Sequence, residues 1–147
     1  MSYLLDTCIL SKVRTLKKFP DKKLEAWISK HNENDFFVSV LTLGEIQAGI
    51  SKLRLNNENE KHKRLILEDW FLEELIPRFN NRIVGVDATI TLTWGRLSED
   101  CRQRGITVPV IDGLLAATAL THNLTLVTEN VSDFIETGVR LFNPWLD

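Results

Sequence analysis

The sequence predicts an α/β fold with a central, mostly parallel five-stranded sheet and helices on both of its faces. Short apolar runs of strand character alternate along the chain with longer segments of helical periodicity, and such alternation is typical of parallel sheets built through helical crossovers. The length of 147 residues, with 44% hydrophobic and 26% charged residues, is ordinary for one globular domain with its own core. We therefore expect a single domain over residues 1–147.

The strands are expected where short apolar runs end at a polar residue or a turn. These runs are residues 3–5, 36–39, 83–86, 124–128 and 139–142. Asp6 and Asp87 directly follow the first and the third run, so each stands at the carboxyl end of an expected strand.

The helices are expected where apolar residues recur at helical spacing between capping and breaking residues. They are residues 9–13, 21–31, 41–50, the stretch between a polar linker at 56–60 and Pro77, 90–101 and 113–122. Asp21 is suited to cap the second helix, Gly105 stands where the C-terminal cap of the fifth belongs, and Asp112 opens the last.

Acidic side chains follow the expected strands, at the edge of the sheet where parallel α/β folds bind ligands. They are Asp6 after the first strand, Glu45 in the helix after the second, Asp112 before the fourth strand and Asp133 after it. Carboxylates gathered at one place raise each other's pKa, and divalent cations make such a cluster tolerable. Mg²⁺ and Mn²⁺ prefer oxygen ligands and can promote phosphodiester hydrolysis, so a metal-dependent hydrolase is one interpretation.

Each of these acids also has a simpler interpretation. Asp6 and Asp112 are suited to helix capping, Glu45 to a solvated helix face and Asp133 to a turn. The sequence leaves these alternatives open, because spacing alone does not show whether the four side chains meet.

The charge balance restricts how the chain could contact a nucleic acid. With 18 Lys and Arg against 20 Asp and Glu, the net charge is −2, whereas proteins that hold nucleic acid by their overall field are basic. Any contact with RNA must therefore come from local patches or through bound cations. Lys52 and Arg54 beside the polar linker and Arg96 in the helix 90–101 are candidates, with a solvated surface as the alternative.

The cellular location is expected to be cytoplasmic. No apolar run approaches the roughly 18 residues of a membrane span, and residues 1–6 show no basic leader followed by an apolar stretch. Cys8 and Cys101 are therefore expected to be reduced thiols.

Four segments, taken in order, are similar to the motifs of a known family over nearly the whole chain. They are Leu4-Leu5-Asp6-Thr7, Ser39 to Gly49 around Glu45, Val110 to Ala119 around Asp112, and Leu126 to Phe134, with a similar closing segment Leu141 to Trp145. Together they resemble the PIN-domain ribonucleases, specifically the VapC and FitB toxins of type II toxin–antitoxin pairs.

The resemblance implies a three-layer PIN-like fold and an endoribonuclease toxin that depends on Mg²⁺ or Mn²⁺ and cuts structured RNA such as tRNA. It also implies a homodimer and a VapB-like antitoxin whose C-terminal segment covers the acidic site in a hetero-oligomeric complex. By position, Asp6, Glu45 and Asp112 match the main metal-site acids, and Asp133 or Asn130 completes the site. The supporting residues by position are Thr7, Thr128 and Asn130.

The chain departs from the family pattern at Asn130, where some relatives have an acid, and at Cys8, where many have Asn. These departures motivate the alternative of a catalytically weakened module that binds RNA or protein. A further alternative is a Cys-dependent phosphatase, because Cys8 and Arg14 have the spacing of a phosphate loop. That segment contains no Gly, and Asp6 disfavours a thiolate nearby, so the phosphatase alternative is the weaker one.

Overall fold

The computed structural model describes residues 1–147 and contains one five-stranded sheet in the order β3-β2-β1-β4-β5. Every neighbouring pair is parallel, so the predicted parallel α/β sheet is confirmed. The strands are β1 (Tyr3–Leu5), β2 (Phe36–Ser39), β3 (Ile83–Val84), β4 (Thr125–Val127) and β5 (Leu141–Phe142).

Helices connect all of these strands. They are α1 (Thr7–Arg14), α2 (Lys22–Ser29), α3 (Val40–Ser51), α4 (Glu58–Asp69), the π-helical segment η2 (Trp70–Leu75), α5 (Ile76–Arg78), α6 (Ala88–Gln103) and α7 (Val110–Thr121), with the short 3₁₀ turns η1 (Glu33–Asp35), η3 (Val131–Asp133) and η4 (Ile135–Thr137). None of them is both long and apolar enough to cross a membrane.

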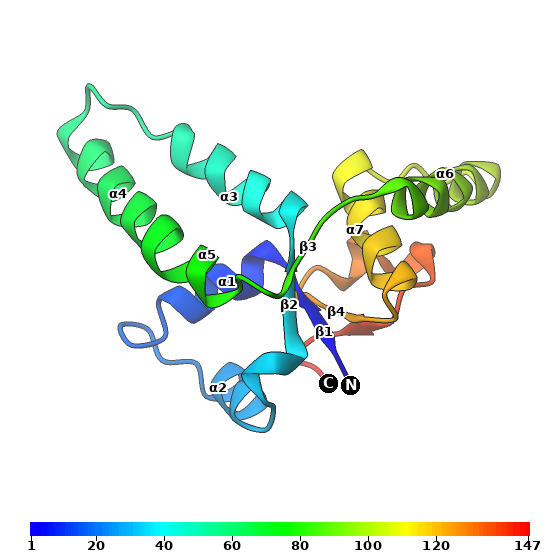
Figure 1. Cartoon of the computed structure of the whole chain (residues 1–147), viewed down its shortest axis with the longest axis horizontal. Helices are drawn as coiled ribbons and strands as arrows, with labels where there is room; N and C mark the ends of the chain where they lie inside the picture. The colour runs from blue at the N-terminus through cyan, green and yellow to red at the C-terminus, as the bar shows by residue number, and fades with distance from the viewer.

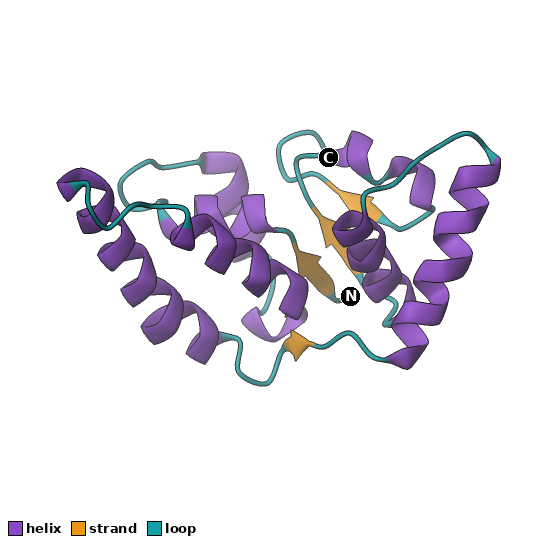
Figure 2. Ribbon diagram, turned by 90° about the horizontal axis from the view of Figure 1, so that it is seen from above, coloured by secondary structure: helices purple, strands orange, loops and turns teal.

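The sheet is covered on both faces, as the alternation of side chains along β1 requires. Tyr3 and Leu5 belong to a core shared with α1, α2, α3 and η2, whereas Leu4 belongs to a second core shared with α7 and β4. Successive side chains of a strand point to opposite faces, so these two cores lie on opposite sides of the sheet. The predicted helices on both faces are therefore confirmed, and Figure 2 shows the strands between the two groups of helices.

The position of β1 in the middle of the sheet decides where the first acid stands. Tyr3 pairs with Phe36 of β2 on one side and with Thr125 of β4 on the other, so Asp6 leaves the sheet at the centre of its carboxyl edge. α3 and α4 extend to one side of this edge and α6 and α7 to the other (Figure 1). The N-terminal turns of α3 and α7 both lie near the carboxyl end of β2 in that view.

The structure corrects the expected boundaries around the polar linker and Pro77. Helix α4 already begins at Glu58, because the Asn57 side chain accepts a hydrogen bond from the Glu60 N–H at 3.1 Å and caps it. Pro77 lies within α5, which continues directly from η2, and the helical stretch ends one residue beyond the proline, at Arg78.

The structure also corrects the beginning of the last helix and two of the strands. Helix α7 begins at Val110 with Pro109 as its N-cap, so Asp112 lies inside the first turn and is not a cap. Strands β3 and β5 contain two residues each, fewer than the expected runs 83–86 and 139–142.

Candidate active site

Asp6 serves as a helix cap and as a buried carboxylate at the end of β1. Its Oδ1 accepts the Thr7 N–H at 2.8 Å, which caps α1, and the side chain belongs to a residue that is only 8% exposed. Its Oδ2 accepts the Thr128 hydroxyl at 2.8 Å. The capping interpretation of Asp6 is thus correct, and it leaves the second carboxylate oxygen to face the neighbouring strand β4.

Thr128 holds Asp6 through a short chain of hydrogen bonds. The Thr128 hydroxyl is fully buried, and it accepts the Asn130 backbone N–H at 3.0 Å while its own proton goes to Asp6. Asn130 therefore supports the site through its main chain, and its side chain belongs to an exposed residue.

Cys8 lies beside the same pair, in a form that does not suit a nucleophile. Its Sγ is 3.7 Å from Asp6 Oδ2 and 3.7 Å from Thr128 Oγ1. Burial, and then the charge of Asp6, raise the pKa of the Cys8 thiol above its ordinary value, although a hydrogen bond from the Glu129 backbone opposes them. The thiol is therefore protonated at neutral pH.

The phosphatase alternative is wrong on structural grounds. Cys8 and Arg14 lie on one regular helix, α1, where no ring of backbone N–H groups can surround a phosphate. The Arg14 guanidinium instead lies 5.7 Å from the centre of the Trp70 ring.

Glu45 of α3 and Asp6 both accept hydrogen bonds from Thr7, the residue that follows Asp6. Glu45 Oε1 accepts the Thr7 hydroxyl at 3.0 Å, so Thr7 alone contacts two of the acids, Asp6 through its backbone N–H and Glu45 through its hydroxyl. Burial of the carboxyl raises the pKa of Glu45, the charges of Asp6 and Asp112 raise it further, and the Thr7 hydrogen bond opposes them. Glu45 is therefore close enough to both other acids for repulsion to matter.

Asp112 joins the cluster from α7. Burial raises the pKa of the half-buried Asp112 carboxyl, and the charges of Asp133 and Asp6 raise it further. The ion pairs of this chain all involve other acids, so no Lys or Arg lies within 4.0 Å of these four carboxylates. The charges of Asp6 and Asp112 act on Glu45, and those of Asp133 and Asp6 act on Asp112, so the four acids lie in one region of the molecule, and no basic side chain of the chain pairs with them.

The donor set fits a hard divalent cation. All four side chains offer carboxylate oxygens, which Mg²⁺ and Mn²⁺ prefer, and their mutual repulsion is what a cation would relieve. No three His, Cys, Asp or Glu side chains are close enough to share one ion as they stand. Asp6 and Glu45 are each turned to a threonine hydroxyl, so a shared ion would require side-chain rotation.

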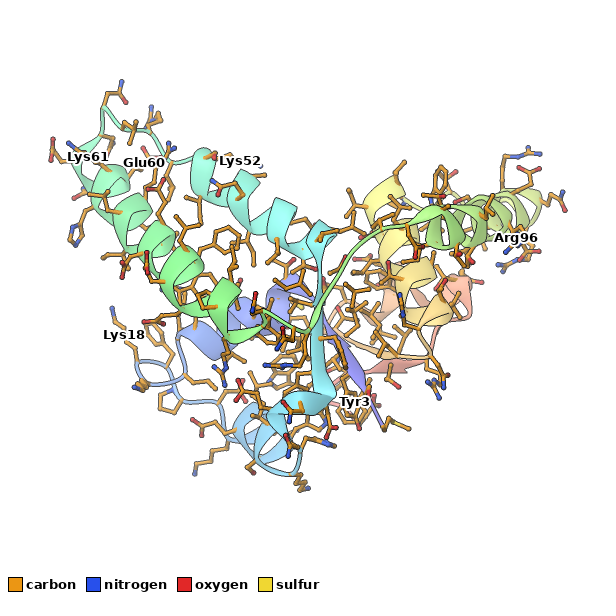
Figure 3. All side chains as sticks on the ribbon, viewed as in Figure 1. Tyr3, Lys18, Lys52, Glu60, Lys61 and Arg96 are labelled. Atoms are coloured by element: carbon orange, nitrogen blue, oxygen red, sulfur yellow. The ribbon has the colours of Figure 1, made fainter.

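The candidate RNA contacts do not gather at the acidic cluster. Figure 3 shows Lys52 toward the far end of α3 and Arg96 on α6, on opposite sides of the molecule. Arg54 is paired with Glu60 at 2.9 Å, which reduces the charge that it can offer. Lys52 and Arg96 therefore do not form one basic patch, because they lie on α3 and α6 on opposite sides of the molecule.

Sequence reasoning missed one lysine near the site. Lys12 of α1 lies 3.3 Å from Glu129, which directly follows Thr128, and 4.6 Å from the centre of the Trp145 ring. Lys12 thereby ties α1 to the segment after β4 and to the C-terminal segment. A basic residue in the last turn of α1 was the only sequence signal, and it did not indicate which partner the lysine finds.

Asp112→Asn is expected to raise the melting temperature of the metal-free protein at neutral pH. The neutral amide removes repulsion from Asp6, Glu45 and Asp133. Because the pKa of Asp112 is raised in the folded state, protonation favours folding, and the penalty for the charge grows as pH rises through that pKa. The gain should therefore shrink as the pH falls through the raised pKa, where the parent carboxyl is neutral as well.

The measurement is a series of thermal melts in EDTA from about pH 3 to about pH 8, a range that spans carboxyl titration. Asp69→Asn is the matched control, because Asp69 is exposed at the end of α4 and forms no ion pair. An equal gain from both variants, or a gain for Asp112→Asn that grows on acidification, would contradict the cluster.

Comparisons with known proteins identify the family of the chain. The profile of the family described as PIN domain matches residues 3–138. Toxin FitB of Neisseria gonorrhoeae is 29% identical over 144 residues, covering 98% of this chain and 99% of that protein. Ribonuclease VapC2 of Rickettsia felis is 31% identical over 145 residues, covering 99% of this chain and 98% of that protein.

Solved structures extend the likeness to the whole fold. The crystal structure of FitAcB from Neisseria gonorrhoeae contains a chain that superposes with a TM-score of 0.84 at 28% identity, covering 99% of both chains. The structure of VapBC2 from Rickettsia felis, bound to a DNA fragment from the promoter, gives a TM-score of 0.72 at 26% identity, covering 97% of this chain and 98% of that one. The PIN-like fold that the sequence predicts is thereby confirmed, and the chain belongs to the PIN domain family, in the group of the VapC and FitB toxins.

Proposed function

We propose that this chain is a metal-dependent endoribonuclease and the toxin of a toxin–antitoxin pair. The observation that carries the proposal is the cluster of Asp6, Glu45 and Asp112, with Asp133 beside it, at the carboxyl edge of the sheet with no cation from the chain. Relatives along nearly the full length are named ribonucleases, which supports RNA as the substrate. Structured RNA such as tRNA is the substrate class that we expect.

In the proposed mechanism the four acids together hold a divalent cation. Asp6, Glu45 and Asp112 would hold Mg²⁺ or Mn²⁺, with Asp133 completing the site. When bound, the cation supplies a Lewis acid for the phosphoryl oxygen and lowers the pKa of a water.

Two threonine hydroxyls hold two of the acids in place. Thr128 donates a hydrogen bond to Asp6, and Thr7 donates one to Glu45. Since a protonated carboxyl is a poor ligand, it matters that the Thr7 hydrogen bond opposes the raised pKa that burial and repulsion produce at Glu45. We expect Thr7 and Thr128 to act as positioning residues.

The alternative of a weakened binding module has less support. Cys8 leaves the hydrogen bond from Thr128 to Asp6 intact, and Asn130 contributes its backbone N–H to that same chain of hydrogen bonds. Neither departure from the family pattern removes one of the four acids. The retained cluster therefore favours a catalytic role.

Cleavage of a tRNA pool is expected in Mn²⁺ and not in EDTA, because the carboxylates alone repel the phosphate and activate no water. Asp6→Asn should slow cleavage at least about a hundredfold, because it removes a charged ligand and not merely an outer-shell partner. The control is Asp69→Asn, an exposed acid outside the cluster, which should cleave like the parent. Cleavage that survives both EDTA and Asp6→Asn would refute the metal mechanism.

Lys52 is expected to contact RNA phosphates. In the Asp6→Asn background, where cleavage is slow, Lys52→Ala should weaken RNA binding and lower the salt slope by about one. Lys30→Ala at the end of α2 is the control, because Lys30 is exposed on an element that holds none of the acids. Fluorescence titrations at several salt concentrations measure the slope, and an unchanged slope for Lys52→Ala would assign Lys52 to a solvated surface.

The partner that we propose is a VapB-like antitoxin with a basic C-terminal segment, bound to a homodimer of this chain. Related structures are toxin–antitoxin complexes, which supports a partner of this kind. A basic side chain among the four carboxylates would neutralise them without metal. A separate hollow of about 440 Å³ lies against α1, and apolar residues such as Ile9, Val13 and Trp70 line it together with the charged Arg14, Lys17 and Glu74. Apolar side chains of the same antitoxin segment could enter it.

Co-expression with the protein encoded next to its gene is expected to give a complex that neither binds Mn²⁺ nor cleaves RNA. Calorimetry with Mn²⁺ measures the first property and the tRNA assay the second, and light scattering of the free chain measures the dimer. A complex that binds Mn²⁺ as tightly as the free chain would contradict occupation of the acidic cluster by the antitoxin.

A further inference from the structure

Asp112 differs from the other acids in what holds it. Asp6 and Glu45 each accept a threonine hydroxyl, at 2.8 Å and 3.0 Å, whereas the Asp112 carboxylate accepts no hydrogen bond from the protein. Helix α7 also has no side-chain cap, because its N-cap residue is Pro109. The position of the Asp112 carboxylate therefore depends on where the first turn of α7 lies.

The first turn of α7 lies directly against a tryptophan of α6. A Cβ atom on Gly113, the residue after Asp112, would be 2.9 Å from both Cδ1 and Nε1 of Trp94. Real Cβ atoms essentially never approach a neighbour so closely, so the indole edge occupies the space that any side chain at this position would need. Gly113 is not in the left-handed region, so space and not backbone conformation requires the glycine.

The contact is steric and contains no hydrogen bond. Trp94 Nε1 is buried without a partner, and so is Ser98 Oγ, one turn further along α6 and 3.7 Å from the same Cβ position. Buried polar atoms without partners cost free energy, so neither atom explains why the indole lies here. The indole edge therefore packs against the bare backbone of Gly113 by shape alone.

We propose that Trp94 is a positioning residue, which sets the distance of Asp112 from Asp6 and Glu45 by stopping α7 at Gly113. The proposal rests on the proposed function, because it concerns the metal and the reaction of that site. Trp94 Nε1 makes no hydrogen bond to any of the acids. The residue acts through the packing of α6 on α7, and the absence of a side chain at Gly113 is what lets α7 come close enough.

Gly113→Ala tests the proposal. The new methyl group meets the indole at 2.9 Å, so α7 or Trp94 must move. We expect Mn²⁺ affinity, measured by calorimetry, and tRNA cleavage each to fall by about tenfold or more, as for a misplaced ligand. Circular dichroism and thermal melting show whether the variant is folded at the assay temperature.

The pair Gly113→Ala with Trp94→Leu separates positioning from a loss of folding. Trp94→Leu alone should lower Mn²⁺ affinity, because it removes the side chain that stops α7. Leucine lacks the indole Nε1 and can turn away from the methyl group, so in the Trp94→Leu background Gly113→Ala should change Mn²⁺ affinity by less than about threefold. A general loss of stability predicts the opposite, because each substitution would add its own damage.

Two control variants change neighbouring positions without altering the contact between Trp94 and Gly113. Gly95→Ala adds a methyl group to α6 with nothing within 4 Å of it, and Ser98→Ala removes the unpaired hydroxyl without touching the indole. Both should bind Mn²⁺ like the parent.

Two results would overturn the inference. One is parent-like Mn²⁺ affinity in Gly113→Ala, and the other is a folded double variant in which Gly113→Ala lowers Mn²⁺ affinity as much in the Trp94→Leu background as in the parent. A parent chain that neither binds Mn²⁺ nor cleaves RNA would refute the proposed function itself and this inference with it. The parent measurements therefore distinguish the two failures.

Discussion

Repulsion between carboxylates is the constraint on which the rest of this structure depends. Asp6, Glu45 and Asp112 come from β1, α3 and α7, and the charges of the other acids raise the pKa of Glu45 and Asp112. No Lys or Arg lies beside them, so the surrounding packing must hold their elements together against the repulsion. The central strand β1, buried on both faces, provides that support by joining the two cores.

The support reaches each acid by a different route. Asp6 is held by the helix that it caps and by the Thr128 hydroxyl, and Glu45 is held by the Thr7 hydroxyl. Asp112 has no such hydrogen bond and depends on the position of its helix. A site assembled in this way keeps its charges close in the absence of a cation, so less reorganisation is needed when a cation or a basic side chain arrives.

The charge of the cluster also explains how a chain of net charge −2 could act on RNA under the proposed function. The bare carboxylates repel phosphate, and a bound divalent cation would offset much of their charge and offer the phosphate oxygens a local positive centre. A basic side chain of an antitoxin would neutralise the same negative charge without supplying a Lewis acid. Under the proposed function the cation and the antitoxin's basic side chain would therefore compete for the same carboxylates. Only the cation would support hydrolysis.

The sequence by itself determined the order of strands and helices, the parallel sheet and the residues that follow each strand, because hydrophobic periodicity and capping residues such as Asp21 act over a few neighbours. It did not show that Asp112 lies inside α7, since Pro109 caps that helix without a side-chain hydrogen bond, nor that a helix runs through Pro77. Only the tertiary structure decided that Thr128 donates to Asp6 and that Trp94 lies against Gly113. These contacts join residues far apart in the chain, and no local pattern encodes which distant atoms packing brings within a few ångströms.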